Sequence, residues 1–464
     1  MHTTIGGGQN VATLLLRHAE MVACMDDEGR EIADGGLFIR DGVIESVGAT
    51  VDLPDSADRI IDLQGHVLMP GMVNTHHHLY QNLTRLLPAA QNAPLFGWLT
   101  SLYPVWERLT PEAFRVSAQL GLAELLLSGC TTSSDHQYIF PNGAQLDDTI
   151  EAAVETGIRF HALRGSMSVG QSDGGLPPDS LVEDEAEILR DSERLIQAFH
   201  SDSPDARVQV ALAPCSPFSV SRELMRDTAL LAREHGVRLH THLAENVEDV
   251  AYSRERFAMT PGEYAEDLGW IGDDVWHAHC VQLEEVDLVR FADSGTGVAH
   301  CPCSNMRLAS GIAPIMKMLS AGVPVGLGVD GSSSNDAGHL LAEARQALLL
   351  QRLREGADAC SVRDALRVAT RGGARVLGRQ NNIGQLTPGF QGDCAAFAVD
   401  DLWHAGSVHD PVASLLLCFT GTAAYTVVGG NVLVDQGQLT TLDLGPLLET
   451  HRAMAVRLAN GELA

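Results

Sequence analysis

Eight apolar segments of strand length alternate with amphipathic helical segments over residues 70–382, and this alternation limits the fold more than any other feature. The expected strands are residues 72–78, 131–135, 158–164, 208–215, 238–243, 275–279, 297–301 and 324–330. Helical segments such as 111–127, 185–199, 222–235 and 284–293 separate them. Strands that are each followed by a helix predict an α/β fold, a (β/α)8 TIM-type barrel. A doubly wound open sheet is the alternative, but it has no need for so many polar strand ends.

Short β segments lie on both sides of this region. Before it, strands are expected at residues 13–24, 35–40, 43–47, 60–63 and 67–68, with an Asp41-Gly42 hairpin turn. After a helical segment at 362–377, strands are expected at 425–428 and 432–434. We therefore predict a small β-sandwich domain formed by residues 1–69 and 383–440, a barrel domain at 70–382, and a C-terminal helix within 441–464.

Charge and cysteine content restrict the partners and the compartment. The chain has 60 acidic and 31 basic residues, a net charge of −29, which disfavours nucleic acid as a partner. Its nine cysteines show no regular spacing and are expected to be reduced, as in a cytoplasmic protein. The first residues do not resemble a signal peptide, and no apolar run reaches the roughly 18 residues of a membrane span. We expect neither secretion nor membrane insertion.

A histidine cluster ends the first expected barrel strand, Met69-Pro-Gly-Met-Val-Asn-Thr-His-His-His78. Side chains alternate along a strand, so His76 and His78 point to one face and His77 to the other. Two imidazoles on one face can bind one metal ion. A chance run of histidines is the alternative for this motif alone.

Other strand ends carry residues of the same chemistry. His242 lies nearer the carboxyl end of its strand than His240, so we expect His242 to be a metal ligand and His240 to pack below it. His279 ends the next strand, and Asp330 ends the eighth. Glu245 follows His242 by three residues, where it can reach a substrate as a proton shuttle, although a glutamate there often only starts a helix. Asp330 likewise has a helix cap as its alternative role.

Together, His76, His78, His242 and Asp330 form a set of three imidazoles and one carboxylate at one end of the barrel. Such ligands suit one divalent metal ion. We expect Zn²⁺, and Fe²⁺ can share these ligands.

These motifs resemble those of the amidohydrolase superfamily, in its mononuclear-metal deaminase branch. They are Pro70-Gly-Met-Val-Asn-Thr-His-His-His78, His240-Thr-His-Leu-Ala-Glu245, His277-Ala-His-Cys280, His300-Cys-Pro-Cys-Ser-Asn305 and Val329-Asp-Gly-Ser332. The segment from Ile383 to Asp393 resembles the region where such chains re-enter their β domain. Many binuclear members carry a bridging lysine on the fourth strand, and residues 208–215 contain none, which favours a single metal.

The resemblance implies a mechanism and an assembly. The metal lowers the pKa of a bound water, Asp330 takes its proton and later delivers it to the leaving group, and His279 orients the hydroxide. Glu245 protonates a ring nitrogen of the substrate, and ammonia leaves. Proteins of this superfamily are commonly dimers or larger, so a homo-oligomer is expected.

The region from Tyr80 to Trp106 narrows the substrate. It resembles the branch members that convert 8-oxoguanine to uric acid, with guanine and isocytosine as side substrates. Within it, Gln81 and Trp98 are candidate substrate contacts, and Phe96, Trp98 and Tyr103 suggest a stacking wall.

Arg164, at the end of the third strand, is a further candidate contact, with an ion pair to a neighbouring acid as its alternative.

Other functions are open to the same residues. An s-triazine chloro- or alkylamino-hydrolase is the alternative enzyme, and a non-catalytic metal-binding scaffold is a third interpretation. The cytidine-deaminase type of zinc site needs Pro-Cys-x-x-Cys, and neither Pro214-Cys215 nor Pro302-Cys303 has the second cysteine at that spacing.

Overall fold

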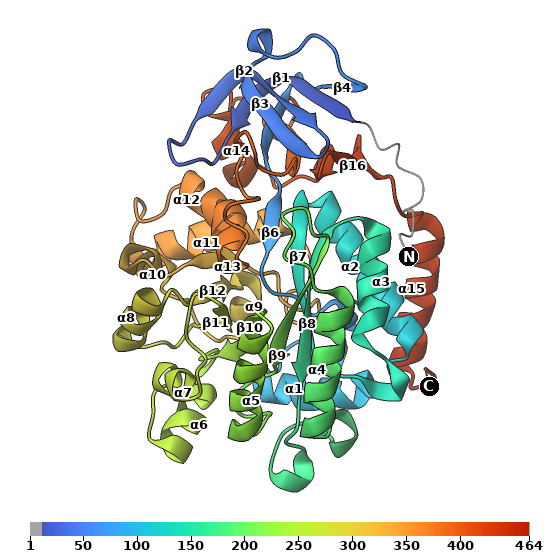
Figure 1. Cartoon of the computed structure of the whole chain (residues 1–464), viewed down its shortest axis with the longest axis vertical. Helices are drawn as coiled ribbons and strands as arrows, with labels where there is room; N and C mark the ends of the chain where they lie inside the picture. The colour runs from blue at the N-terminus through green and yellow to red at the C-terminus, as the bar shows by residue number, and fades with distance from the viewer. Residues whose placement is uncertain (1–11, 464) are drawn as a thin grey trace.

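A closed barrel of eight parallel strands forms the centre of the computed structural model, which describes residues 12–463 (Figure 1). Its strands are β6 (Met72–Asn74), β7 (Cys130–Gln137), β8 (Arg159–Ser166), β9 (Val208–Pro214), β10 (Arg238–Leu243), β11 (Val275–His279), β12 (Gly297–His300) and β13 (Val325–Leu327). The pairing of Leu327 with Asn74 closes the ring between β13 and β6. The TIM-type barrel predicted from the sequence is confirmed.

Helices surround the barrel, and α1 lies across the end that is lowest in Figure 1. They are α1 (Leu95–Trp106), α2 (Pro111–Leu127), α3 (Leu146–Thr156), α4 (Glu185–Phe199), α5 (Arg222–Glu234), α6 (Val247–Phe257), α7 (Pro261–Asp267), α8 (Glu285–Ser294), α9 (Pro302–Arg307), α10 (Ile315–Ala321), α11 (Leu340–Glu355), α12 (Val362–Arg367) and α13 (Gly373–Val376). Their starts follow local signals: Thr110 caps α2 ahead of Pro111, and the Asp184 carboxylate accepts two backbone N–H groups of α4.

Strands from both parts of the chain that flank the barrel form one nine-stranded sheet. They are β1 (Thr13–Ala23), β2 (Glu31–Arg40), β3 (Val43–Ala49), β4 (Arg59–Asp62), β5 (His66–Pro70), β14 (Cys394–Ala398), β15 (Tyr425–Val428), β16 (Asn431–Asp435) and β17 (Gln438–Leu439). The two parts join within the sheet at the antiparallel pair β5–β14. A bulge between Leu16 and Ala19 interrupts the β1–β2 ladder, and apolar side chains of the sheet form a core of their own.

The connections follow two expectations from the sequence. In the β2–β3 hairpin, Asp41 and Gly42 both adopt left-handed backbone angles, with φ of 49° and 82°, as a type I′ turn requires. Beyond the sheet, α14 (Pro411–Leu417) lies between β14 and β15, and α15 (Leu444–Ala459) packs against α2.

The first barrel strand is shorter than expected, because it ends at Asn74 rather than at His78. Beyond Asn74 the backbone N–H of Thr75 still donates to the carbonyl oxygen of Leu327 at 2.8 Å, and the N–H of His78 donates to the Nδ1 atom of its neighbour His77 at 2.8 Å. The chain then enters a 3₁₀ turn, Leu79–Thr84. His76 and His78 therefore leave the barrel mouth on an irregular segment.

All nine cysteines are unpaired, in agreement with the expectation of reduced thiols. Within residues 12–463, no helix combines the length and the apolarity that crossing a bilayer requires. The segment on which the expected lack of a signal peptide depends, residues 1–11, lies outside the described residues.

Candidate metal centre and active site

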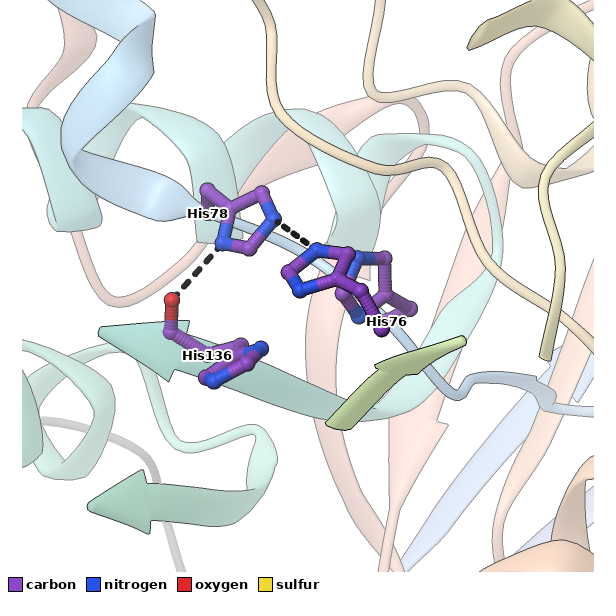
Figure 2. Close-up of side chains that lie close together, drawn as sticks. His76, His78 and His136 are labelled. Carbon is purple, nitrogen blue, oxygen red and sulfur yellow. Dashed lines mark hydrogen bonds between the residues drawn. The ribbon is translucent and has the colours of Figure 1, made fainter. Parts of the chain in front are cut away.

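Three imidazoles and one carboxylate converge at the carboxyl ends of β6, β10 and β13. The Nε2 atoms of His76 and His78 each lie 3.3 Å from Asp330 Oδ1, and His78 Nε2 lies 3.2 Å from His242 Nε2. Figure 2 shows the ring of His78 next to the backbone oxygen of His136, with His76 close by. His76 and His78 are buried, as is Asp330. The structure thus brings together all four residues predicted as metal ligands.

Backbone carbonyl groups fix the tautomers of two of these histidines. His78 Nδ1 lies 2.7 Å from the carbonyl oxygen of His136, and His242 Nδ1 lies 2.6 Å from that of Cys215. A carbonyl oxygen can only accept, so each Nδ1 carries the proton and donates it. The Nε2 atoms of both rings are left as bare lone pairs.

The protonated nitrogen of His76 can be deduced in the same way, from its hydrogen bond to the ring of His240. His240 Nδ1 donates to the carbonyl oxygen of Trp276 at 3.0 Å, so His240 Nε2 is an acceptor. His76 Nδ1 lies 2.9 Å from that atom and must donate to it. His76 Nε2 is therefore also a bare lone pair, and it has no hydrogen-bond partner among the described residues. His240 supports a ligand from below, as its position on the strand predicted.

The cluster of three imidazole lone pairs and one carboxylate contains hydrogen-bond acceptors but no donor. These electron-rich atoms repel one another unless a cation lies between them. Burial lowers the pKa of His76 well below its ordinary value and that of His242 to about 3, so both rings are neutral, as metal ligands must be. Hydrogen bonds from the opposite ring nitrogen orient each imidazole, the arrangement usual around protein-bound metals. The residues present therefore fit a divalent metal ion.

His279 and Glu245 stand beside this cluster. His279 Nε2 lies 3.6 Å from Glu245 Oε2 and 3.9 Å from Asp330 Oδ2, while its Nδ1 lies 2.9 Å from the side-chain oxygen of Asn305. Glu245 is buried, and its Oε1 atom has no partner among the described residues. Burial, together with the nearby Asp330 and Asp249, raises the pKa of Glu245 well above its ordinary value. Glu245 is thus suited to carry and donate a proton near neutral pH.

Left-handed backbone conformations occur where these strands end. The φ angles are 50° at Ala244, 69° at His279, 51° at Cys280 and 60° at Asp330. Such angles cost roughly 1–2 kcal/mol for each residue other than glycine. Strained residues cluster at functional sites because the surrounding structure holds them there.

A cavity opens onto Glu245, His279 and Asp330. It is lined by His78, Gln81, Leu95, Trp98, Leu99, Tyr103, Tyr138, Cys215, Ser216, Phe218, His242, Glu245, Asp249, His279, Leu308, Asp330 and Ser334. These residues include three carboxylates but neither lysine nor arginine. The cavity thus suits an uncharged ligand better than an anion.

Two of the three predicted substrate contacts line this cavity. Gln81 is fully buried, and its amide nitrogen has no partner among the described residues. A Cβ atom at Gly331 would lie 1.9 Å from Gln81 Oε1, so the amide packs directly against the loop after Asp330. Trp98 is held by a 3.0 Å hydrogen bond from its Nε1 to the carbonyl oxygen of Ser333. Tyr103 also lines the cavity, whereas Phe96 packs against Phe218.

The third predicted contact, Arg164, does not line the cavity. Its guanidinium group donates to Glu183 at 2.7 Å and to Asp191 at 2.7 Å. Its charge is therefore satisfied by the segment that follows β8, and the alternative of a local ion pair is the one that the structure shows. A contact between Arg164 and the substrate stays a prediction that this position does not favour.

Three residues of the site were not predicted. His136 stacks on His242 at 5.0 Å, Asp249 accepts the Glu245 N–H at 3.0 Å, and Asn305 holds His279. His136 lies one residue before the end of β7, so the rule that functional residues lie at the carboxyl ends of barrel strands could have found it. Asp249 and Asn305 lie on helices, where no comparable pattern exists.

Comparison with known proteins decides the family. The profile described as the amidohydrolase family matches residues 67–433. The chain belongs to the amidohydrolase family. Among amidohydrolases, 8-oxoguanine deaminase of Pseudomonas aeruginosa is 50% identical over 432 residues, covering 92% of this chain and 96% of its own. An isoxanthopterin deaminase from an unknown prokaryotic organism is 37% identical, over 86% and 87% of the two chains.

A solved amidohydrolase structure shares the whole fold. Atrazine chlorohydrolase from Arthrobacter aurescens, complexed with zinc, superposes with a TM-score of 0.90 at 36% identity, over 95% of this chain and all of its own. The resemblance noted in the sequence is therefore confirmed at the level of the family and of its fold.

Proposed function

We propose that the protein is a metal-dependent deaminase of a free purine base, which converts 8-oxoguanine to uric acid and ammonia. One observation carries this proposal. Glu245, His279 and Asp330 face the same cavity, and Asp330 also belongs to the set of metal ligands, which contains no hydrogen-bond donor. The identity of 50% with an 8-oxoguanine deaminase supports the choice of substrate.

The proposed cofactor is one divalent ion held by His76, His78, His242 and Asp330, with Zn²⁺ favoured and Fe²⁺ compatible. A zinc complex of a relative with the same fold supports Zn²⁺. When bound, such an ion lowers the pKa of water enough to supply hydroxide near neutral pH.

The chain's own groups then move the protons. Asp330 accepts a proton from the attacking water, and the hydroxyl groups of Ser304 and Ser334 orient its Oδ2 atom at 2.5 and 3.1 Å. His279 orients the water toward the substrate carbon, because its ring is fixed from behind by Asn305. Glu245 protonates the adjacent ring nitrogen, for which its raised pKa suits it. Asp330 returns its proton to the departing amine, which leaves as ammonia. Glu245 takes the proton of the new hydroxyl group as the product carbonyl forms, which restores its protonated state.

The lining of the cavity supports a free base rather than a nucleotide. No cationic side chain lines it that could balance a phosphate. The unpartnered amide nitrogen of Gln81 offers a donor to a carbonyl oxygen or a ring nitrogen of the substrate, and Trp98 offers an aromatic wall. The net charge of −29 and nine unpaired cysteines support a small-molecule partner in the cytoplasm, rather than nucleic acid or a membrane.

A triazine hydrolase is the second candidate, because the zinc-containing relative acts in that class. The experiment is ammonia release from zinc-loaded protein with 8-oxoguanine, guanine, isocytosine and a hydroxylated triazine, tested side by side. We expect 8-oxoguanine to react fastest and uric acid to accumulate. Reaction of the triazine alone would replace the first proposal by the second. Bound zinc with no release of ammonia from any of the four compounds would favour the metal-binding scaffold.

We also propose that the protein is a homo-oligomer, a dimer or larger. An apolar patch between β14 and β15 supports this: Leu402, Trp403 and Val408 are 80%, 62% and 79% exposed, and Trp403 stacks on Phe419 at 5.4 Å. Patches of this kind commonly mark protein interfaces. Light scattering on the purified protein tests the proposal, and Trp403→Glu should then reduce the measured mass.

A further inference from the structure

Glu343 lies at the start of α11, outside the cavity, and only 2% of its surface is exposed. Its two carboxylate oxygens serve different parts of the chain. Oε2 accepts the backbone N–H of Cys303 at 3.2 Å, and Oε1 accepts the side-chain amide of Asn335 at 2.7 Å. Glu343 therefore connects α9 to the loop between β13 and α11.

The first connection leads to both His279 and Asp330. Cys303 lies in the first turn of α9, where a backbone N–H has no acceptor within the helix, and the carboxylate of Glu343 supplies one. The next two residues of the helix point to the site. Ser304 donates to Asp330 Oδ2 at 2.5 Å, and Asn305 accepts the Nδ1 proton of His279 at 2.9 Å.

The second connection leads to Asp330 from the other side. The amide nitrogen of Asn335 donates to the carbonyl oxygen of Val329 at 2.6 Å, as well as to Glu343. Val329 directly precedes Asp330. The carboxylate of Glu343 thus fixes the direction of an amide that holds the backbone of the eighth strand end.

His279 and Asp330 need such support, because both have left-handed backbone angles. Residues in sparsely populated conformations keep them only where neighbouring groups over-determine the geometry. The two residues lie 51 positions apart in the sequence and on different strands, so local chain geometry cannot set their relative position.

We propose that Glu343 is a positioning residue of the active site, which fixes Asp330 and His279 relative to each other through α9 and Asn335. The part of this proposal that concerns turnover depends on the proposed function. The part that concerns Asp330 as a ligand of the metal does not.

The variant that tests it is Glu343→Gln. Glutamine has one acceptor oxygen, so its NH2 group faces one of the two donors, Cys303 N–H or the Asn335 amide, and that hydrogen bond is lost. The matched control is Gln351→Glu, two turns later on α11. Gln351 is also buried and bridges two groups outside the site, the carbonyl oxygen of Ala313 at 3.0 Å and the N–H of Met316 at 3.5 Å. Each substitution breaks one contact of a buried bridge on the same helix.

The readouts are the rate of zinc release to a chelator, kcat and KM, and Tm. We expect Glu343→Gln to release zinc roughly ten- to a hundredfold faster and to lower kcat by a similar factor, the usual effect of losing support behind metal ligands. KM should stay within about twofold, since Glu343 does not line the cavity. Gln351→Glu should lower Tm about as much as Glu343→Gln does, but it should change neither the rate of zinc release nor kcat.

Equal zinc release and equal kcat in the two variants would overturn the proposal. If Glu343→Gln does not fold, Asn335→Ala is judged by the same criteria, because it removes the connection from Glu343 through Asn335 to Val329 and leaves the one from Glu343 to Cys303. If the wild-type protein releases no ammonia from 8-oxoguanine, the proposed function fails, and the comparison of zinc release still decides the role of Glu343.

Discussion

His78 and His242 face each other through two unprotonated nitrogens, with their Nε2 atoms 3.2 Å apart. The Nδ1 atom of each ring carries the proton and donates it to a backbone carbonyl oxygen, of His136 for His78 and of Cys215 for His242. Two lone pairs at this distance repel, so the fold holds these rings in an arrangement that is favourable only with a cation between them.

Removal of divalent ions with a chelator should abolish deamination and lower Tm, and added Zn²⁺ should restore both. At a zinc concentration 1,000-fold above Kd, binding stabilises the folded state by about 4 kcal/mol. Thermal scans with and without zinc measure this shift. His242→Ala should lose it, whereas His277→Gln, a buried change outside the ligand set, should keep it. A full zinc shift in His242→Ala would contradict the ligand set.

Glu245→Gln should retain stoichiometric metal and lose most turnover, by roughly 10²–10⁴-fold, because the amide cannot donate a proton to the ring nitrogen. Elemental analysis and initial rates of ammonia release measure the two effects. Glu248→Gln, three residues later on the exposed face of α6, is the matched control and should behave as the wild type. Near-normal turnover in Glu245→Gln would remove this residue from the mechanism.

Gln81→Leu should lower kcat/KM for 8-oxoguanine by roughly 10- to 100-fold, since a substrate acceptor then loses its buried partner at a cost of about 1–3 kcal/mol. Steady-state kinetics on 8-oxoguanine tests this. Gln91→Leu changes an exposed glutamine of the same connecting segment and should leave kcat/KM unchanged. An unchanged kcat/KM in Gln81→Leu would exclude the contact.

Arg164→Met should leave KM within about twofold of the wild-type value and lower stability by about 1–3 kcal/mol, because it removes charged hydrogen bonds to Glu183 and Asp191. Substrate kinetics and the midpoint of urea unfolding measure the two quantities separately. A tenfold increase in KM with unchanged stability would restore Arg164 to the substrate site.

The pair Arg159–Asp393 predicts a loss of stability in acid. Both side chains are 1% exposed, with Arg159 Nε 2.6 Å from Asp393 Oδ2. Burial of Asp393 opposes ionisation, yet Arg159 holds its pKa below the ordinary value. A carboxyl group with a lowered folded-state pKa stabilises the fold fully above its unfolded pKa near 4, and this contribution disappears as pH falls through the folded value.

Asp393→Asn should therefore cost about 3–5 kcal/mol at pH 7, because it leaves Arg159 buried without a counter-ion. Urea unfolding at pH 7 and at pH 3 measures this, and the difference between variant and wild type should shrink at the lower pH. Glu151→Gln removes an exposed partner of Arg115 and should change little at either pH. An equal difference at both pH values would contradict the assigned pair.

The barrel and the ligand set could be predicted because both depend on local patterns. Strand and helix periods differ, and in a barrel every strand delivers its carboxyl end to the same mouth. His76, His242 and Asp330, from distant segments, therefore had to meet. The end of β6 at Asn74 could not be predicted, because the sequence pattern of the strand continues past it to His78.

The hydrogen-bond and ion-pair partners of individual side chains could not be predicted from the sequence. Arg164 turns toward Glu183 and Asp191, which lie 19 and 27 residues later, just before and within α4. The helix could be predicted, but which of its acidic side chains faces Arg164 depends on how α4 packs against β8. The protonated nitrogen of each histidine depends on carbonyl groups of neighbouring strands, which a single sequence does not reveal. The domain boundaries at 69/70, 382/383 and 440/441, and the chemical roles of Glu245 and His279, stay predictions.

Because β5 pairs with β14, which is synthesised more than 300 residues later, β5 cannot complete its pairing until most of the chain has been made. Val67 pairs with Phe397, and β5 leads directly into the segment that carries His76 and His78. A ribosome adds about 5–20 residues per second, so roughly 15–65 s pass between emergence of the two strands. During that interval one edge of β5 stays open to other chains. Cells that overproduce this protein should therefore accumulate aggregates seeded by nascent chains, and slower initiation or a chaperone that covers β5 should raise the yield of folded enzyme.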